Sequence, residues 1–379
     1  MQKFLKKILS KKYNFSFSNI NQYDVVIFDI EGSDEIKKFI VNESINSIIY
    51  DYNNFRIYIN LKFLTKYFIN TCRYWNRRKS LFHNLYILYI LTEIQIINPK
   101  ILITYNDDNF IYHTLIKFLN NIKFIAIQNG LREKFIRKRI KHNINHEDYY
   151  CFGKTDIEKQ KSSKWLINNG MPVGSLRAGI ALSKFKNDQK IFDIGYISEY
   201  ASVKKHLIIN KEWNNNIKNV DKIMSKFFHE NKNLKLIVIL RTDDAEERKY
   251  FHEIFGSNII FSKPKEYLNS YKTIIQSKLV IGFASTLLIE ALGLSTKALA
   301  IDTSNSDEYF DFNNNIGYKF KNNNDLKKRI NDLINTSYDA YLENMKETIV
   351  DVMNLDKYSP PHLIIRNFIN KELLSNTDV

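Results

Sequence analysis

Cysteine, glycine and proline are scarce in this chain, and it has no long apolar run. Two cysteines among 379 residues, Cys72 and Cys151, cannot build a disulfide framework or a four-cysteine zinc site, and they favour a reducing compartment. No run of about 18 uncharged apolar residues predicts a membrane-spanning helix. The basic residues 1–12 lack the apolar length and the small-residue cleavage site of a secretory signal. We therefore expect a soluble protein of the cytoplasm.

Several catalytic motifs are also missing. The sequence contains no Walker P-loop, no G-x-S-x-G and no G-x-G-x-x-G, which disfavours P-loop ATP hydrolysis, serine hydrolysis and hydride transfer. The eight histidines are scattered, and the one helix-spaced pair, His142 and His146, has no nearby Glu in the order of a zinc protease. We expect neither a metal site nor a cofactor.

What the chain does have is length, apolar residues and positive charge. Its 44% hydrophobic and 14% aromatic residues exclude a disordered chain, and its length predicts two domains. The net charge of +15 suggests a polyanionic partner such as nucleic acid, an anionic membrane or a phosphorylated substrate. The densest basic cluster is residues 132–141. It can be a solvated face, or it can bind lipid phosphates, a lipid-linked acceptor or nucleic acid.

Apolar runs alternate with helical patterns throughout, which predicts an α/β fold with doubly wound parallel sheets. We expect strands at residues 23–29, 45–50, 100–105, 123–127, 148–153, 190–197, 234–240, 258–261 and 298–302, one or two helices over 61–97, and further helices over 213–231, 244–255, 267–276 and 362–374. The glycine-containing residues 170–179 and the charged residues 184–190 indicate an interdomain crossing. The predicted architecture is two Rossmann-like domains, 1–182 and 183–355, that face each other across a cleft, with a C-terminal helix in 356–379 packing back on the first domain.

The most informative segment is residues 278–293, where an apolar strand leads through a turn into an apolar helix. Gly282 is expected to let the backbone turn tightly, and Ser285 and Thr286 stand where the helix begins. Unpaired N–H groups and the positive end of the helix dipole favour a phosphate at that point. Glu290 follows about one helical turn later and can reach the hydroxyls of a ribose. The alternative is that Ser285 caps a core helix and Glu290 is solvated.

Acids, amides and one arginine follow other predicted strands. Ligands in parallel sheets bind beyond the carboxyl ends of the strands, so these residues are candidates for ligand binding or catalysis. Each can instead have a structural role, as a helix cap, as a hydrogen-bond acceptor in a turn or as a member of a local ion pair. Arg241 directly follows a buried strand and can neutralise a phosphate. The other candidates are Asp29, Glu31, Asp107, Asp108, Gln128 and Asn129.

Together these segments resemble GT-B glycosyltransferases, and more narrowly bacterial surface-polysaccharide biosynthesis proteins of the capsule and O-antigen type. The residues that carry the resemblance span most of the chain, about 20–310. They are residues 99–109 (PKILITYNDDN), 124–132 (FIAIQNGLR), 150–153 (YCFG), 173–177 (VGSLR) and 284–293 (ASTLLIEALG).

The resemblance implies that the second domain binds a nucleotide-activated sugar as substrate. Donor contacts would come from Gly282, Arg241, Ser285, Thr286 and Glu290. The first domain would bind a glycan or lipid-linked acceptor and supply the catalytic carboxylate, with Glu31 the first candidate, Asp107 the second and Asp108 beside it, while Gln128, Asn129 and Arg132 would line the acceptor side of the cleft. Related enzymes that use CMP- or CDP-linked donors carry His-Pro where this chain has Arg241 and Thr242.

Three other functions remain open. A CDP-polyol phosphotransferase of the teichoic-acid type and a UDP-sugar 2-epimerase share the architecture, and a basic nucleic-acid-binding protein would account for the charge. Nucleic acid is the least favoured partner, because no recognised module or basic and aromatic face is evident. Basic segments can also place the protein peripherally on the cytoplasmic face of a membrane.

Overall fold

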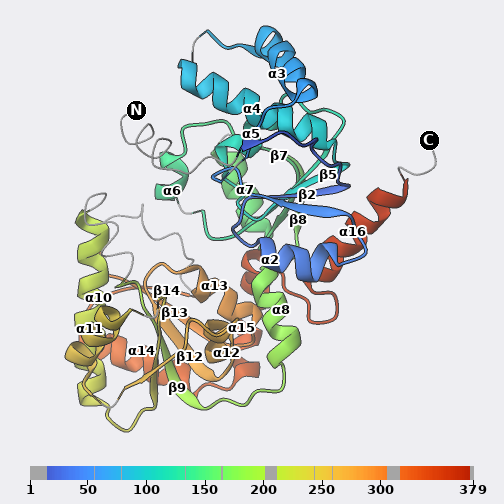
Figure 1. Ribbon diagram of the computed structural model, residues 1–379. Coiled ribbons are helices and arrows are strands. Elements are labelled where there is room, and N and C mark those ends of the chain that lie inside the picture. The colour runs from blue at the N-terminus through green and yellow to red at the C-terminus, as the bar shows by residue number, and fades with distance from the viewer. Residues whose placement is uncertain are drawn as a thin grey trace.

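A computed structural model describes residues 15–375 apart from 55, 78, 133, 164, 201–210, 243, 258 and 305–315. Within these residues each half of the chain forms a six-stranded parallel sheet, and β1 (Phe15–Ser16) pairs with β4 (Ile57–Tyr58) in a separate two-stranded sheet. The N-terminal half lies above the C-terminal half in Figure 1. The predicted pair of doubly wound parallel sheets is confirmed.

The N-terminal sheet is built from short apolar strands whose side chains alternate between its two faces. Val25 and Ile27 belong to one core and Val26 and Phe28 to another, as the two-residue period of a strand requires. The strand order is β3 (Ser47–Tyr50), β2 (Val25–Phe28), β5 (Ile101–Thr104), β6 (Lys123–Ile127), β7 (Asn145–Cys151) and β8 (Leu166–Pro172).

Helices cover both faces of this sheet. On one face α4 (Leu81–Ile97) and α5 (Phe110–Leu115) contribute to a separate core, and α3 (Leu61–Tyr74) packs on α4 as an outer layer. On the other face the core continues into the C-terminal half. The remaining helices of this half are α2 (Ser33–Ile36), the π-helical turn η1 (Lys37–Val41), α6 (Lys134–Arg139), α7 (Lys154–Ser162) and α8 (Leu176–Phe185).

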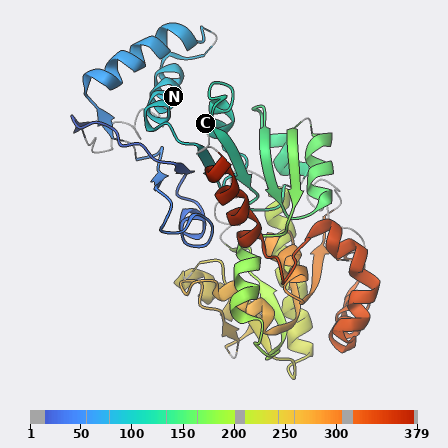
Figure 2. The same ribbon diagram turned by 90° about the vertical axis from the view of Figure 1, so that its right-hand side faces the viewer.

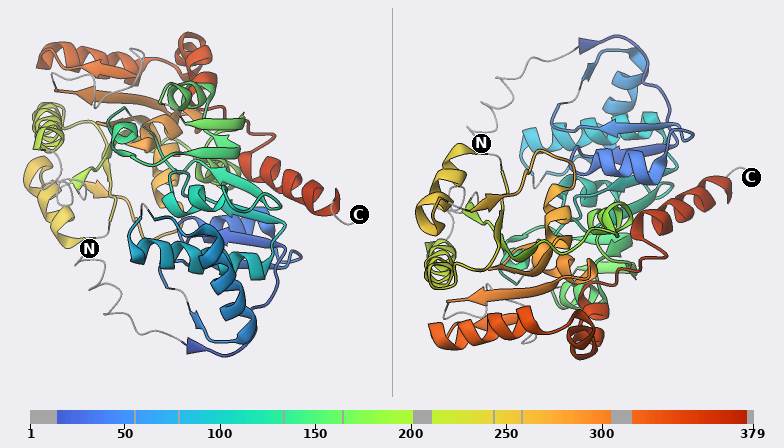
Figure 3. Two further views of the ribbon diagram at one scale, coloured as in Figure 1. Left: turned by 90° about the horizontal axis from the view of Figure 1, so that it is seen from above. Right: turned by 90° about the horizontal axis from the view of Figure 1, so that it is seen from below.

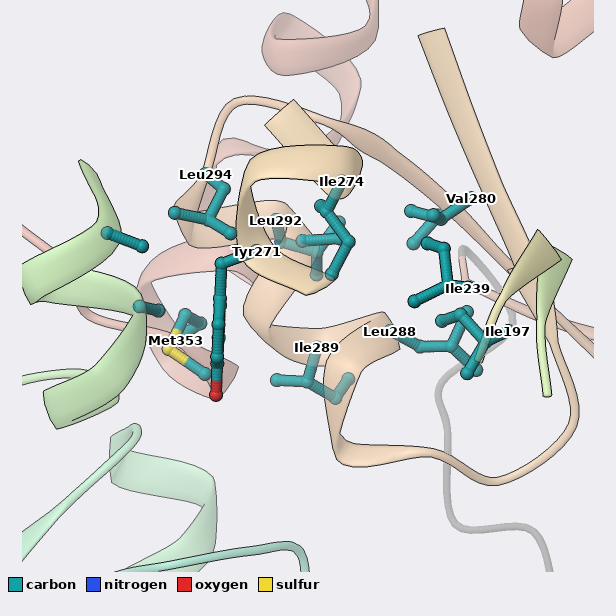
Figure 4. Packing of buried hydrophobic residues seen from close by; sticks show 14 of the residues in the cluster. Ile197, Ile239, Tyr271, Ile274, Val280, Leu288, Ile289, Leu292, Leu294 and Met353 are labelled. Atoms are coloured by element: carbon teal, nitrogen blue, oxygen red, sulfur yellow. The ribbon is translucent and has the colours of Figure 1, made fainter. Parts of the chain in front are cut away.

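The C-terminal sheet has the order β11 (Ile260–Phe261), β10 (Leu236–Ile239), β9 (Phe192–Ile197), β12 (Ser277–Gly282), β13 (Lys297–Asp302) and β14 (Gly317–Lys319). Apolar residues of α13 (Thr286–Gly293) pack towards Ile197 and Ile239 of the sheet and towards Tyr271 of α12 (Asn269–Ile275) (Figure 4). The other helices are α10 (Lys211–Glu230), α11 (Ala245–Phe255), α14 (Asn323–Asn335), α15 (Tyr338–Val352) and α16 (Pro361–Ser375).

Some elements differ from the sequence prediction. The long helical stretch is two helices, α3 and α4, and β7 begins three residues before its predicted start. β8 was not predicted, and its last three residues, 170–172, fall within the segment that the sequence indicated as part of the interdomain crossing. Its Asn, Gly and Pro residues have low strand propensity, and they are tolerated because β8 lies at the edge of the sheet. The short β1, β4 and β14 were likewise not predicted.

The chain crosses between the two halves twice. It leaves the N-terminal sheet through α8, and after α15 it returns through residues 351–361, here called the return segment, to α16. Helix α16 packs against η1 and lies along the N-terminal half (Figures 2 and 3). Arg366 donates to the carbonyl oxygen of Phe39, and the ring of Phe368 meets that of Tyr150 edge to face.

Four of the 11 glycines lie against the return segment: Gly153, Gly174, Gly179 and Gly293. A Cβ atom at Gly153 would clash with the Asp351 carbonyl oxygen, because it would lie well inside the van der Waals contact distance of the two atoms. Asn354 fastens the same region, because its backbone N–H donates to the carbonyl oxygen of Phe152 at 2.8 Å and its side-chain amide to that of Pro172 at 2.7 Å. At Gly153 and Gly174 the crossing therefore brings backbone against backbone, whereas Gly179 and Gly293 leave room for side chains of the return segment.

We predict that Gly153→Ala lowers the free energy of unfolding by about 2–3 kcal/mol, because the backbone of Asp351 cannot yield as a flexible side chain can. The matched control is Gly130→Ala. Gly130 is not among the described glycines with positive φ, and a Cβ atom there would meet only the ends of side chains, the nearest being Thr286 Oγ1 at 3.3 Å, so this change should alter the free energy of unfolding by no more than about 1 kcal/mol. Chemical denaturation measures both, and equal costs would contradict a packing role for Gly153.

Candidate functional site

Each sheet has one point where the chain reverses its direction of travel across the sheet. In the N-terminal half the chain runs from β2 to the edge strand β3 and then continues from β5 on the other side of β2. In the C-terminal half the corresponding neighbours are β9 and β12. Crevices at the carboxyl ends of such strand pairs are where open parallel sheets bind ligands. Glu31 and Asp107 follow the first pair, and Gly282 to Thr286 follow the second.

Asp29 closes the bottom of the N-terminal crevice. It has a positive φ of 85°, and its carboxylate accepts hydrogen bonds from the backbone N–H of Ile30 at 2.7 Å, from the Tyr52 hydroxyl at 3.1 Å and from the Asn106 amide at 3.2 Å. These bonds tie together the ends of β2, β3 and β5. The side chain is only 8% exposed, so Asp29 acts as the turn acceptor that the sequence allowed.

A hydrogen-bonded series connects the predicted acids of this half. The Glu31 carboxylate is exposed and accepts from the Asn129 amide at 3.2 Å. The amide oxygen of Asn129 accepts from the Arg132 guanidinium at 2.7 Å, and Arg132 is ion-paired with Asp107. Burial raises the pKa of Asp107 to about 6 against the opposing effect of Arg132. Glu31 is thus open to a ligand, whereas Asp107 is enclosed and already paired.

Two further predicted residues of this half have different surroundings. Asp108 is partly exposed and lies 3.8 Å from Arg132. Gln128 does not line a cleft as expected, because its side chain is 0% exposed. Its amide group donates to the Gly130 carbonyl oxygen at 3.0 Å and accepts from the Phe152 N–H at 2.8 Å. Gln128 therefore shapes the loop after β6, and the amide next to it, Asn129, is the one at the crevice.

Ser285 and Thr286 stand at the N-terminus of α13, as predicted. Ser285 has the extended backbone of an N-cap residue, but its side chain makes no capping hydrogen bond. The Thr286 hydroxyl accepts from the backbone N–H of Leu131 in the other half at 3.1 Å. The start of α13 therefore touches the loop that holds Asn129 and Arg132, and the Ser285 hydroxyl is left for another partner.

Gly282 has a role other than the predicted tight turn. It is the last residue of β12, and it is not among the described glycines with positive φ. A Cβ there would lie 3.3 Å from Cβ of Ile197 on the neighbouring strand β9. Glycine at this position thus serves the close packing of β12 on β9 and leaves the crevice between them narrow.

Arg241 lies at the end of β10, which is next to β9, and its side chain is 57% exposed. Its guanidinium is 3.8 Å from the carboxylate of Glu199, a residue that sequence reasoning missed. The buried Glu247 accepts from the Ser198 hydroxyl and from the backbone N–H groups of Arg241 and Thr242. This carboxylate fixes the ends of β9 and β10 side by side. Neither Glu199 nor Glu247 belongs to a sequence motif that would have identified it as a site residue.

Glu290 departs from its expected role as a ribose contact. Its carboxylate is 3% exposed and accepts hydrogen bonds from the Ser175 hydroxyl and from the Tyr271 hydroxyl, the latter at 3.0 Å. Burial raises its pKa, and these two hydroxyls and Arg177 oppose that rise. Since Ser175 is the N-cap of α8, Glu290 links the crossing helix to the C-terminal half in this arrangement.

The structure thus brings Glu31, Asn129 and Arg132 of one half close to Thr286 of the other. Arg241 and Glu199 follow adjacent strands of the C-terminal sheet. Gln128 and Glu290 are buried and make hydrogen bonds inside the protein. In the part of the chain that the structure describes, no group of three or more His, Cys, Asp or Glu side chains is placed to hold a metal ion. An exposed carboxylate facing a helix N-terminus can accept a proton on one side while phosphate is bound on the other.

Solved structures with the same architecture include proteins that act on nucleotide-linked substrates. A UDP-GlcNAc 2-epimerase from Neisseria meningitidis bound to UDP-GlcNAc matches with a TM-score of 0.51 and 12% identity, over 93% of this chain and 99% of that one. MnaA of S. aureus with UDP matches with a TM-score of 0.52 and 11% identity, over 93% and 97%. The wall teichoic acid polymerase TagF matches with a TM-score of 0.51 and 10% identity, over 94% and 91%.

At these identities the likeness establishes the GT-B architecture, and the predicted fold class is confirmed. A comparison with curated proteins finds no match. A family described as "putative O-antigen biosynthesis protein" matches residues 125–373, which include the second half of the N-terminal sheet, the whole C-terminal sheet and most of α16. This match covers more than half of the chain, so the protein belongs to that family of O-antigen biosynthesis proteins.

Proposed function

We propose that the protein transfers a sugar from a nucleotide-activated donor to a growing surface-glycan acceptor, such as an O-antigen. Family membership supports a role in O-antigen biosynthesis, and two proteins of similar fold have been seen with UDP-GlcNAc and with UDP. The donor would bind the C-terminal half, and a glycan or lipid-linked acceptor the N-terminal half. The nucleotide sugar is a substrate, so the proposal needs no resident cofactor.

One observation carries this proposal: the loop after β6 is contacted from both sides. Asn129 binds the exposed carboxylate of Glu31, and two residues later Leu131 binds the hydroxyl of Thr286 at the start of α13. A candidate base and a candidate phosphate site therefore meet at the same short segment. A transfer reaction requires this proximity, because the acceptor hydroxyl and the donor must be held within reach of each other.

The chemistry follows from these positions. The donor phosphates would lie at the N-terminus of α13, where backbone N–H groups, the helix dipole and the Ser285 hydroxyl stabilise negative charge. Charge grows on the phosphate oxygen as its bond to the sugar breaks, and these donors favour that transition state. The acceptor oxygen forms the new bond to the anomeric carbon. In an inverting reaction its proton passes to Glu31, which is exposed, rather than to the enclosed Asp107.

Two other reactions fit the same architecture, and products distinguish them. The purified protein is incubated with CMP-, CDP-, UDP- and GDP-linked donors in separate reactions. Sugar transfer releases the nucleotide in the presence of acceptor glycan. Release of CMP from a CDP-polyol would instead indicate phosphotransfer, as fits the TagF likeness, and conversion of a UDP-sugar without acceptor would indicate epimerisation.

We predict that one nucleotide raises the melting temperature and that Ser285→Ala weakens its binding about tenfold, since a hydrogen bond to phosphate is lost. At a concentration near 100 times the dissociation constant, the stabilisation by the nucleotide should fall from about 2.7 to about 1.4 kcal/mol. Without nucleotide the variant should melt like the parent, because the Ser285 side chain caps nothing.

The matched control is Ser337→Ala, since the Ser337 hydroxyl does cap its helix by accepting from the Ala340 N–H. This variant should lose about 1 kcal/mol of stability and keep the full nucleotide shift. An undiminished shift in Ser285→Ala would contradict phosphate binding at α13.

The roles of Glu31 and Asp107 can be distinguished by measuring both stability and turnover of their variants. We predict that Glu31→Gln lowers turnover at least about 100-fold while changing the free energy of unfolding by no more than about 0.5 kcal/mol, as is usual for an exposed site. Asp107→Asn should instead cost about 3 kcal/mol of stability, because it leaves the buried Arg132 without its carboxylate.

Replacing both partners provides the control. The double variant Asp107→Asn/Arg132→Met removes the buried cation together with its anion, so it should be more stable than Asp107→Asn alone by at least about 1 kcal/mol. Full turnover in Glu31→Gln would remove this residue as the base. No gain in the double variant would show that the ion pair does not set the stability of this loop.

A further inference from the structure

Helix α3 carries two apolar stripes, and only one of them is packed. Phe63, Tyr67, Asn70 and Tyr74 follow each other at spacings of four, three and four, so they share one side of the helix. This side meets α4: the Phe63 ring lies 4.8 Å from that of Tyr89, and the Asn70 amide donates to Thr92 at 2.8 Å and to Gln95 at 2.9 Å. These contacts fix the helix on the surface of the N-terminal half.

The second stripe, here called the outer stripe, consists of Leu61, Leu64, Phe68 and Trp75. Their spacings of three, four and seven also define one helix side. Leu61 is 82% exposed, Phe68 69%, Leu64 48% and Trp75 37%. Single exposed apolar side chains are ordinary on protein surfaces, but four large ones in a row on one helix indicate a surface that is covered in use.

Positive charge lies on a third side of α3, beyond Thr65 and Ile69 from the outer stripe, and is here called the basic flank. It consists of Lys62, Lys66 and Arg73. Within the described residues none of the three is ion-paired with a carboxylate. The sequence from 52 to 92 contains no Asp or Glu, whereas it contains Arg56, Lys62, Lys66, Arg73, Arg77, Arg78 and Lys79. The partner of this surface should therefore be both apolar and negatively charged.

A cavity at the end of the α3–α4 turn has the same character. Its volume is about 300 Å³, and its lining includes Lys79, Lys117, Lys141, His83 and His142 but no carboxylate. The Nε2 atom of His142 lies 3.0 Å from the carbonyl oxygen of Asp108, so the cavity adjoins the crevice at the end of β5.

We propose that the outer stripe and its basic flank dock on an anionic lipid bilayer. An anionic bilayer is both apolar and negatively charged. Its acyl region takes up leucine and aromatic side chains at a shallow depth, and its headgroups attract lysine and arginine. None of the described helices is both long enough and apolar enough to cross a membrane, so α3 would lie in the plane of the interface. This surface differs from residues 132–141, the basic cluster for which the sequence left contact with lipid phosphates open.

The position of α3 suits this arrangement. It lies at the end of the N-terminal half that is farthest from the C-terminal half (Figures 1 and 2). A bilayer on this side would leave the C-terminal half, which we propose binds the nucleotide sugar, in water, where soluble donors diffuse. The docking itself does not depend on which reaction the site performs.

The test is sedimentation of the full chain with vesicles of phosphatidylethanolamine and phosphatidylglycerol, compared with vesicles of phosphatidylcholine. We expect binding to the anionic vesicles, and binding at least about tenfold weaker for Leu64→Ser/Phe68→Ser, because the inserted apolar area is lost. Lys62→Ser/Lys66→Ser should remove most of the preference for anionic lipid, at about fivefold for each charge. High salt should weaken the parent more than this second variant.

The control Leu166→Ser/Leu374→Ser removes two apolar side chains that are as exposed, at 62% and 68%, but lie outside α3, and should bind like the parent. All variants should melt within a few degrees of the parent, since none of the replaced side chains is buried. Equal binding by the parent and Leu64→Ser/Phe68→Ser overturns the proposal.

Two results would identify another occupant of the stripe and also overturn the proposal. One is a dimer in sedimentation velocity that Leu64→Ser/Phe68→Ser dissociates, without vesicle binding by the parent, which would assign the stripe to a second copy of the chain. The other is vesicle binding by a chain that lacks residues 1–14, without vesicle binding by the full chain. This result would show that the N-terminal segment of the chain itself occupies the outer stripe.

Discussion

The approach of backbone to backbone at the crossing between the halves determines the rest of the structure. Gly153, Gly174, Gly179 and Gly293 let the return segment lie directly against the ends of β7, α8 and α13. Parallel sheets expose their ligand-binding ends on one side only, so two such sheets form one site only if those ends are made to face each other. The crossing supplies that constraint, and Glu290 strengthens it by joining α12 and α13 to the first turn of α8.

Within that frame the two sides of the candidate site are built differently. The N-terminal side is held by a buried ion pair and a series of amide contacts, so the positions of Asn129 and Arg132 are fixed before any ligand arrives. The C-terminal side depends on a helix start whose serine hydroxyl caps nothing and on an arginine that is more than half exposed. For the sugar transfer that we propose, a rigid N-terminal side opposite an adaptable C-terminal side would let the donor enter and the nucleotide leave.

Strand and helix positions were largely predictable, because buried parallel strands are short apolar runs and the runs at β2, β5, β6, β9 and β12 are unambiguous. Two edge strands, β8 and β14, were not predictable, since β8 reads as polar residues with a glycine and a proline, whereas the apolar edge strands β3 and β11 were predicted. The serine and threonine at the start of α13 were placed correctly because their position follows from local sequence. The surroundings of Gln128 and Glu290 depend on partners 24 and 115 residues away, and no local pattern encodes which partner a buried polar group finds.

The spacing that forms the outer stripe of α3 has a chemical consequence. Cys72 follows Phe68 by four residues, so it belongs to the same side of the helix, and it is exposed. Cys151 is buried, and burial raises the pKa of its thiol, which keeps it unreactive. The native chain therefore carries one accessible thiol, which lies in the outer stripe between Phe68 and Trp75. A polarity-sensitive maleimide dye would attach there alone, and its emission would report whether lipid, protein or water covers α3 without any change to the sequence.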